Sequence, residues 1–142
     1  MPGFAQSHAI TDVCILVRDI EASIGFYTDK LGFELLHRAP GFADFRGAGV
    51  TLAVWDRTHI SSHTKVTTDL TSKSEVLIAV RISQSDKIDE IYEELKSKGV
   101  EFTQPPANYP WNARCIYFHG PDDEVWEIYA WLEGGAPGAV EQ

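Results

Sequence analysis

A single carboxylate, Glu127, stands among large apolar side chains in the stretch Val125–Trp131. This stretch is rich in β-branched and aromatic residues with a period of two, which predicts a β-strand with two different faces. Glu127 then shares one face with Val125, Tyr129 and Trp131. Burying a charge there is costly unless the charge is paired, hydrogen-bonded or bound to a cation. Glu127 is therefore either a salt-bridged, half-exposed residue or a carboxylate that faces a ligand cavity.

The six residues from Tyr109 to Arg114 gather groups that recognise ligands. They form a loop that enters a predicted strand, with two flat aromatic rings, an amide and a guanidinium. Tyr109 and Trp111 offer rigid faces to a planar or hydrophobic ligand, and Arg114 suits a carboxylate on it. The alternative is that Trp111 packs against a neighbouring part of the chain and Arg114 neutralises Glu127 or Asp12. Both interpretations stay open, and they are compatible with each other.

Four histidines are candidates for metal or proton chemistry. His59 and His63 are four residues apart, so one helical turn would place them on the same side and within reach of one metal ion. Solvated histidines are common in Ser/Thr-rich segments, and that is the interpretation we favour. His37 and His119 flank predicted strands, where we expect them to be solvated or hydrogen-bonded. The sequence has no Ser-His-Asp or Cys-His spacing for a nucleophile and no Gly-rich phosphate loop.

The composition is that of one soluble globular domain. The chain has 142 residues, of which 44% are hydrophobic and 23% charged, and a net charge of -9. This charge argues against nucleic acid and against anionic membrane surfaces, both of which attract basic patches. No apolar run approaches the roughly 18 residues of a membrane span.

The two cysteines and the first residues indicate a cytoplasmic protein. Cys14 and Cys115 both fall inside predicted strands, which fits buried, reduced thiols. Their spacing offers no zinc signature. The segment from Met1 to Phe4 does not have the pattern of a signal peptide.

The elements that must position these residues follow from hydrophobic period and turn residues. In the first half, strands are expected over residues 10–17, 33–38, 42–46 and 50–55. A helix between the first two begins after Asp19 as N-cap and ends at Gly32. Residues 1–8 are expected to form an arm.

Residues 56–73 break the pattern, since eight of these eighteen are Ser or Thr. No apolar period survives, so we expect a long connection between two modules, and loops of this length are usually functional or mobile. The role of this connection, with its two histidines, stays open.

The same order of elements then repeats. Strands are expected over residues 75–81, 100–103, 114–118 and 125–131, with a helix capped by Ser85 and ended by Gly99. Three pairs of segments align: 12–18 with 75–81, 32–34 with 99–101, and 50–55 with 124–129. The last pair places Ala53 opposite Glu127. Residues 133–142 are expected to be a frayed tail.

The repeat and several motifs resemble the vicinal oxygen chelate superfamily, which contains glyoxalase I, bleomycin-resistance proteins, epimerases and extradiol dioxygenases. The motifs are Val17–Ser23 running to Phe26-Tyr27, Leu31–Glu34, Pro110–Arg114, and Gly120–Asp123 leading to Trp126–Ile128. The resemblance implies an α+β fold in which two tandem βαβββ modules form curled mixed sheets around a ligand cup. One domain would span residues 1–142, with module one at about 9–55, the connection at 56–73, module two at about 74–132, and the tail at 133–142.

The resemblance also implies where a metal would bind. Family enzymes place ligands at four inward positions, which correspond here to Asp12, Ala53, Glu75 and Glu127. Only Glu127 matches the usual residue, Ala53 cannot coordinate, and the common histidines are absent. A histidine-rich iron or zinc site is therefore not expected. The three carboxylates would suit Mg²⁺, Mn²⁺ or Ca²⁺.

Two functions remain at this point. The first is a small-molecule-binding protein of the bleomycin-resistance type, without a transition metal, which takes an aromatic or cationic ligand into an acidic cup. Trp55, Tyr109, Trp111, Arg114 and Tyr129 would contact that ligand. The second is a lyase, isomerase or dioxygenase whose divalent metal polarises a substrate oxygen while a carboxylate such as Glu127 moves a proton. Either protein is expected to be a cytoplasmic homodimer.

Overall fold

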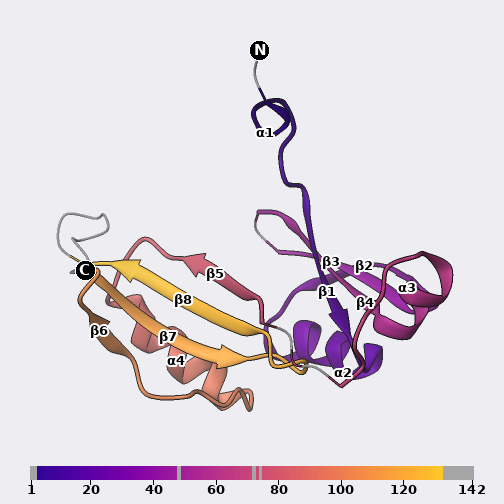
Figure 1. Ribbon diagram of the computed structural model, residues 1–142. Coiled ribbons are helices and arrows are strands. Elements are labelled where there is room, and N and C mark those ends of the chain that lie inside the picture. The colour runs from indigo at the N-terminus through magenta and orange to yellow at the C-terminus, as the bar shows by residue number, and fades with distance from the viewer. Residues whose placement is uncertain (1–2, 48, 72, 74, 133–142) are drawn as a thin grey trace. The chain divides into compact units, whose positions relative to one another are not determined.

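The computed structural model describes residues 3–47, 49–71, 73 and 75–132 (Figure 1). The chain divides into two compact units, residues 1–72 and 73–142. Each unit contains a four-stranded mixed sheet that is not closed. Together with the helices of each unit, these sheets confirm the predicted α+β fold class. The expected tail at 133–142 lies outside the described residues.

The first unit has the sheet order β1-β4-β3-β2, in which β1 and β4 are parallel and the other neighbours are antiparallel. Its strands are β1 (Asp12–Val17), β2 (Glu34–Ala39), β3 (Phe42–Arg46) and β4 (Thr51–Asp56). Its helices are α1 (Phe4–Ser7), α2 (Ile20–Gly25), the π-helical turn η1 (Phe26–Lys30) and α3 (Arg57–His63). Tyr27 is fully buried and meets the ring of Phe45 at 5.9 Å, so η1 closes the core on the helix side of this sheet.

The second unit repeats this arrangement with the order β5-β8-β7-β6. Its elements are β5 (Leu77–Arg81), α4 (Lys87–Ser97), β6 (Ala107–Tyr109), β7 (Ala113–His119) and β8 (Val125–Trp131). Strand β5 runs parallel to β8, while β8, β7 and β6 are antiparallel neighbours. Helix α4 packs on β7 and β8, where apolar side chains from helix and sheet are buried together: Ile88, Leu95, Ile116, Phe118, Trp126 and Ile128.

The predicted helix ends are confirmed at three of four positions. Asp19 caps α2, since its carboxylate accepts the Ala22 N–H at 3.1 Å. Gly32 and Gly99 have φ angles of 80° and 90°, which glycine adopts without strain. Ser85 as a side-chain cap is wrong, because α4 begins at Lys87 with Asp86 at the N-cap position, and no side-chain hydrogen bond caps it.

Two predicted segments differ from the structure. The Ser/Thr-rich connection contains a helix, α3, which begins where the Asp56 carboxylate accepts the His59 N–H at 3.0 Å. Residues 100–103 make only a single bridge, Phe102 to Phe118, and the fourth strand of the sheet is β6 instead. Pro105 and Pro106 have no N–H to donate, so regular pairing resumes only after them.

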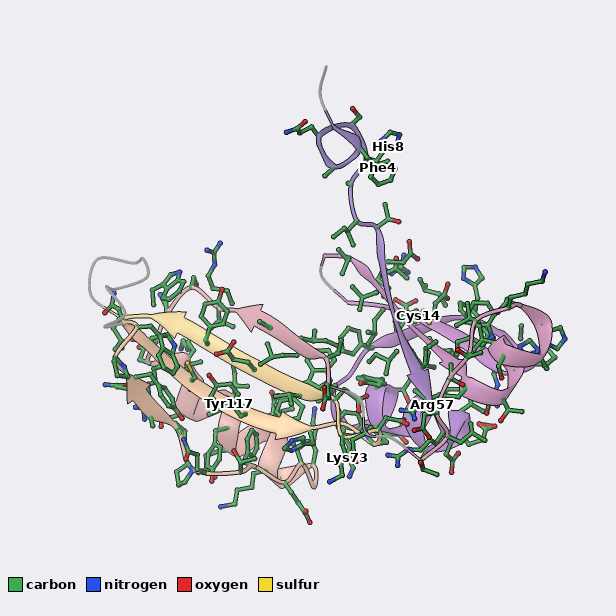
Figure 2. All side chains as sticks on the ribbon, viewed as in Figure 1. Phe4, His8, Cys14, Arg57, Lys73 and Tyr117 are labelled. Atoms are coloured by element: carbon green, nitrogen blue, oxygen red, sulfur yellow. The ribbon has the colours of Figure 1, made fainter. Side chains whose placement is uncertain are left out.

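A buried arginine fastens the connection to the first sheet. Arg57, labelled in Figure 2, is 4% exposed. Its guanidinium donates to the carbonyl oxygens of Leu16 at 2.9 Å and Asp69 at 2.6 Å. These bonds compensate part of the cost of burying the charge. They join the end of β1, the start of α3 and the segment beyond α3, although these lie far apart in the sequence.

Candidate functional site

One face of the second sheet collects the chemistry-bearing residues of that unit. The β7–β8 register pairs Tyr117 with Glu127 and Cys115 with Tyr129, so all four side chains project from the same side. Helix α4 covers the other side. We call the side that carries these four residues the Glu127 face.

Tyr117 and Glu127 form the central contact of the Glu127 face. The Tyr117 phenol on β7 (labelled in Figure 2) donates to Glu127 Oε2 at 2.6 Å. Burial raises the pKa of Tyr117 far above its ordinary value, and the hydrogen bond to the carboxylate raises it further. The phenol therefore stays a neutral donor at physiological pH, and it holds one oxygen of the carboxylate in a fixed position.

Cys115 projects from the same face, two residues before Tyr117 on β7, and is 1% exposed. Burial raises the pKa of the Cys115 thiol, and the negative charge of Glu127 raises it further. Hydrogen bonds with Tyr117 and Trp111 lower this pKa but do not reverse the shift. The expectation of a buried cysteine is confirmed for Cys115. It is wrong for Cys14, which lies in β1 but is exposed.

Tyr109 and Trp111 extend the Glu127 face with an aromatic stack. Their ring centroids are 4.7 Å apart with planes 16° from parallel, and Tyr109 meets Tyr117 edge-on at 6.0 Å. The turn between β6 and β7 produces this stack. Asn112 has a φ of 68° there, a conformation that asparagine tolerates better than most residues, and its N–H donates to the Tyr109 carbonyl at 3.1 Å.

Arg114 lies on the opposite side of the sheet. Its guanidinium donates to both carboxylate oxygens of Asp89 on α4, at 2.8 and 3.0 Å, and to Asn108 at 2.9 Å. The hydrogen bond from Arg114 lowers the pKa of Asp89. The expectation that Arg114 contacts a ligand beside Glu127, or neutralises Glu127, is therefore corrected, because strand alternation directs its side chain to α4.

The first sheet carries a different set at the corresponding positions. Ala53 occupies the position equivalent to Glu127, and the carboxylate is found one strand away, at Asp44, which pairs with Ala53 across β3–β4. Asp44 Oδ1 accepts from the His37 ring Nδ1 at 2.9 Å and from its backbone N–H at 3.0 Å. Sequence reasoning missed Asp44. The alternation of Phe42, Asp44 and Arg46 would have placed Asp44 on one face of its strand, and the β3–β4 register shows that this is the face of Ala53.

The three carboxylates proposed as metal ligands are placed as follows. Asp12 pairs with Thr51, whereas the neighbour of Ala53 on β1 is Cys14. The neighbour of Glu127 on β5 is Ala79. Glu75 precedes Ala79 by four residues, a distance of about 13 Å along an extended chain. Within each unit, as far as the chain is described, no three His, Cys, Asp or Glu side chains are placed to hold a metal ion. A site made from all three carboxylates would draw on both units and stays a prediction.

The two histidines of the connection do lie on one helical turn. The rings of His59 and His63 on α3 stack at 4.1 Å between centroids. The indole N–H of Trp55 donates to His59 Nδ1 at 3.0 Å. Because the indole nitrogen can only donate, neutral His59 carries its proton on Nε2, which then has no lone pair for a metal. This pair is not arranged as a chelate.

Trp55 and Tyr129, the remaining predicted wall residues, are both half-buried and bordered by aromatic rings. Trp55 meets Phe42 edge-on at 6.0 Å in the first unit. Tyr129 meets Trp131 at 5.1 Å in the second unit. Each unit thus places aromatic rings beside a carboxylate on one face of its sheet.

Two open mixed sheets, each built from a strand-helix-strand-strand-strand unit with polar and aromatic residues on one face, define a glyoxalase-like fold. The chain belongs to the Glyoxalase/Bleomycin resistance protein/Dioxygenase superfamily, whose family model matches residues 8–128. No helix among the described residues is long and apolar enough to cross a membrane.

Three relatives illustrate the similarity. A crystal structure of a glyoxalase/bleomycin resistance protein/dioxygenase from Nocardioides is 52% identical, with a TM-score of 0.86 over 94% of this chain and 90% of that one. The bleomycin resistance protein of Geobacillus stearothermophilus is 36% identical over 89 residues, 59% of this chain and 67% of that protein. A lactoylglutathione lyase from Agrobacterium tumefaciens shares the fold, with 17% identity and a TM-score of 0.69 over 86% of this chain and 92% of that one.

Proposed function

We propose that this protein binds a small molecule, planar and aromatic or cationic, on the Glu127 face and without a transition metal. The observation that carries the proposal is the Glu127 carboxylate, fixed by Tyr117 at 2.6 Å on the face that also holds the Tyr109–Trp111 stack. Flat rings and a positioned carboxylate together suit a ligand that is both planar and positively charged.

The electrostatics of the chain support a cation. The net charge is -9, which raises the local concentration of cationic ligands. The cationic side chain predicted for this region, Arg114, is engaged by Asp89 on the other side of the sheet. Arg114 therefore does not neutralise the Glu127 carboxylate. The hydrogen-bond partner of Glu127 on the Glu127 face is the uncharged phenol of Tyr117.

The relatives support the class of function. A protein named for bleomycin resistance is 36% identical over 89 residues. We therefore propose that this protein binds and sequesters a drug-like molecule. Tyr129 would add an aromatic wall on this face, Trp55 of the first unit stays a predicted ligand contact, and the protein would act as a homodimer in the cytoplasm.

The test is a set of titrations followed by tryptophan fluorescence and calorimetry. The probes are bleomycin, a planar acridinium dye and an uncharged ring system of the same size. We expect the cation to bind at least 10-fold more tightly than the uncharged ring, with an affinity that falls as salt rises. Equal affinity for the two dyes, or no binding of any probe, would contradict the proposal.

A second candidate is a lyase, isomerase or dioxygenase that uses Mg²⁺, Mn²⁺ or Ca²⁺ on Asp12, Glu75 and Glu127. It is favoured by one observation, a carboxylate at the second-unit ligand position where family enzymes place one. The donor set does not fit a transition metal, because Ala53 cannot coordinate and no histidine occupies the other positions. Metal analysis of protein purified without chelator decides between the candidates, since the second requires a stoichiometric divalent ion.

A further inference from the structure

A pocket of about 540 Å³ lies in the second unit, between the last turn of α4 and the segment that follows it. Its size suits a small molecule with one ring. We call it the Lys96 pocket, and its lining residues are Tyr92, Lys96, Gly99, Val100, Glu101 and Phe102. Phe102 pairs with Phe118, whose side chain lies on the side of the sheet that α4 covers. The Lys96 pocket is therefore on the opposite side of this sheet from the Glu127 face.

The way in which α4 ends gives this pocket its two walls. Gly99 has a φ of 90° and reverses the chain, and its N–H donates to the Lys96 carbonyl at 3.0 Å. The Val100 N–H donates to the Leu95 carbonyl at 3.1 Å. The chain then runs back beside β7 and pairs with it at a single bridge. The last turn of α4 forms one wall of the pocket, and this returning segment forms the other.

Two aromatic rings form the apolar part of the pocket. The centroids of Tyr92 and Phe102 are 4.7 Å apart, with planes at 52°. Both side chains are half-buried, so each keeps an exposed part that a ligand can cover. Phe118, which is 1% exposed, meets Phe102 edge-on at 5.5 Å and supports it from the core. An aromatic ligand therefore gains buried contact with rings that are already in place.

Lys96 brings a positive charge to these rings. It lies one helical turn after Tyr92, and its Nζ is 5.4 Å from the centroid of the Tyr92 ring. In the described part of the chain, Lys96 forms no ion pair with a carboxylate, whereas Lys87 on the same helix is paired with Glu90. An ammonium that already occupies the face of Tyr92 repels a ligand cation and attracts a ligand carboxylate.

Negative charge nearby weakens this attraction but does not cancel it. The net charge of -9 is spread over the whole chain, and physiological salt screens charges beyond about 8 Å. Among the described lining residues Glu101 is the only carboxylate, and it belongs to the other wall. A ligand carboxylate in contact with the Lys96 ammonium is closer to that ammonium than to Glu101, so the attraction prevails.

We propose that the Lys96 pocket binds a small aromatic carboxylate, whose ring covers Tyr92 and Phe102 and whose carboxylate contacts Lys96. This site is separate from the Glu127 face and does not rest on the proposed function. One chain would then bind two ligands of opposite charge, on the two sides of its second sheet.

The first experiment titrates the full ¹⁵N-labelled chain with four compounds: 3-phenylpropionate, its uncharged amide, 3-phenylpropylamine and propionate. We expect 3-phenylpropionate to bind at millimolar concentration, about fivefold more tightly than the amide, as a partly exposed ion pair allows. The amine should bind more weakly than the amide, because Lys96 repels it. Propionate should bind at least about tenfold more weakly than 3-phenylpropionate, because the ring contact is lost.

The same spectra locate the binding site. The backbone amide resonances of residues 96–102 should move with 3-phenylpropionate. The indole N–H resonance of Trp111, which lies on the Glu127 face, should stay in place.

The second experiment changes the charges of the pocket one at a time. Lys96→Met keeps the apolar stem and removes the charge, so the affinity for 3-phenylpropionate should fall to that for the amide. Glu101→Gln should tighten binding of 3-phenylpropionate. Lys98→Met and Glu94→Gln are the matched controls, since each removes the same kind of charge close by without touching the pocket. Both should change the affinity by less than about twofold.

Several outcomes would overturn the proposal. They are no binding of 3-phenylpropionate, equal affinity for the carboxylate and its amide, and tighter binding of the amine. An affinity that Lys96→Met leaves unchanged or Glu101→Gln lowers, or resonance shifts centred on Trp111, would also overturn it. The compound series uses the wild type alone, so it decides the proposal even if a variant fails to fold. The cationic probes test the proposed function separately.

Discussion

Tyr117 donates its phenolic hydrogen to Glu127 across the β7–β8 ladder, with 2.6 Å between the two oxygens. The two residues are directly paired in the register, ten positions apart in the sequence. In the first unit the equivalent pair is Asp44 and Ala53, so the carboxylate there sits on the third strand of the repeat and bonds to His37 instead. The two units of one repeat thus present different polar groups from corresponding positions.

Replacing Tyr117 by Phe should change how stability depends on pH above 9. The folded-state pKa of Tyr117 is raised, so above the ordinary value of about 10 the folded protein holds a proton that the unfolded chain has released. The free energy of unfolding must then fall as pH rises, by up to about 1.4 kcal/mol per pH unit for this one group. Tyr117→Phe should remove that part of the slope and cost about 1 kcal/mol at pH 8 through the lost hydrogen bond.

Urea unfolding at pH 8.0, 9.5 and 10.5 measures this slope. The pKa of Cys115 is also raised, so its titration lowers the free energy of unfolding with rising pH in the same direction. The wild type and Tyr117→Phe should therefore both carry Cys115→Ala. Tyr109→Phe is the control, since it removes a phenol from the same face without touching Glu127. Identical slopes with and without the Tyr117 hydroxyl would show that the phenol titrates normally in the folded protein.

Glu127→Gln should leave stability within about 1 kcal/mol of the wild type at pH 8, because the amide oxygen can still accept the Tyr117 hydrogen. Binding of the cationic probes should fall by about 10-fold, since the charge is lost. Thermal melts with and without Mn²⁺ provide the check. A wild type that gains melting temperature with Mn²⁺, together with a destabilised mutant that does not, would favour the metal-dependent candidate.

Trp111→Ala should weaken binding of the planar probes by about 1–3 kcal/mol, the range for a buried aromatic contact. Folding should survive, because Trp111 lies in a turn at the edge of the sheet and stacks mainly on Tyr109. Circular dichroism and the titrations above measure the two effects. A mutant that unfolds would assign Trp111 to the structure of the turn.

Arg114→Gln should leave ligand binding unchanged. Its guanidinium is bonded to Asp89 and Asn108 on the side of the sheet that α4 covers. The ion pair is partly solvent-exposed, so its loss should cost at most about 1 kcal/mol of stability. The same titrations and melts apply, and a large loss of affinity would place Arg114 at the ligand.

The protein should be a homodimer in solution at tens of micromolar. Each sheet is open, and unpaired strand edges favour association with another sheet. Light scattering coupled to size-exclusion chromatography measures the mass directly against the 15.8 kDa of one chain. A single species of monomer mass would count against the prediction.

Local patterns in the sequence determined much of this structure. The alternation in residues 125–131 assigned Glu127 and Tyr129 to one face, and the β8 register confirms it. Asp19 and Gly32 marked the ends of the first helical segment, because capping and left-handed turns depend on a few adjacent residues. The internal repeat, with the order of strands and helix it implied, followed from the same short-range signals.

Tertiary structure alone decided which side chains meet. Tyr117 became the partner of Glu127 only through the strand register, and Arg114 became the partner of Asp89 only because α4 packs on that side of the sheet. Helix α3 forms in a segment without apolar period, since Asp56 caps it and Arg57 is bound by two distant carbonyls. Propensity and period act over a few residues, whereas these contacts depend on segments that only the folded chain brings together.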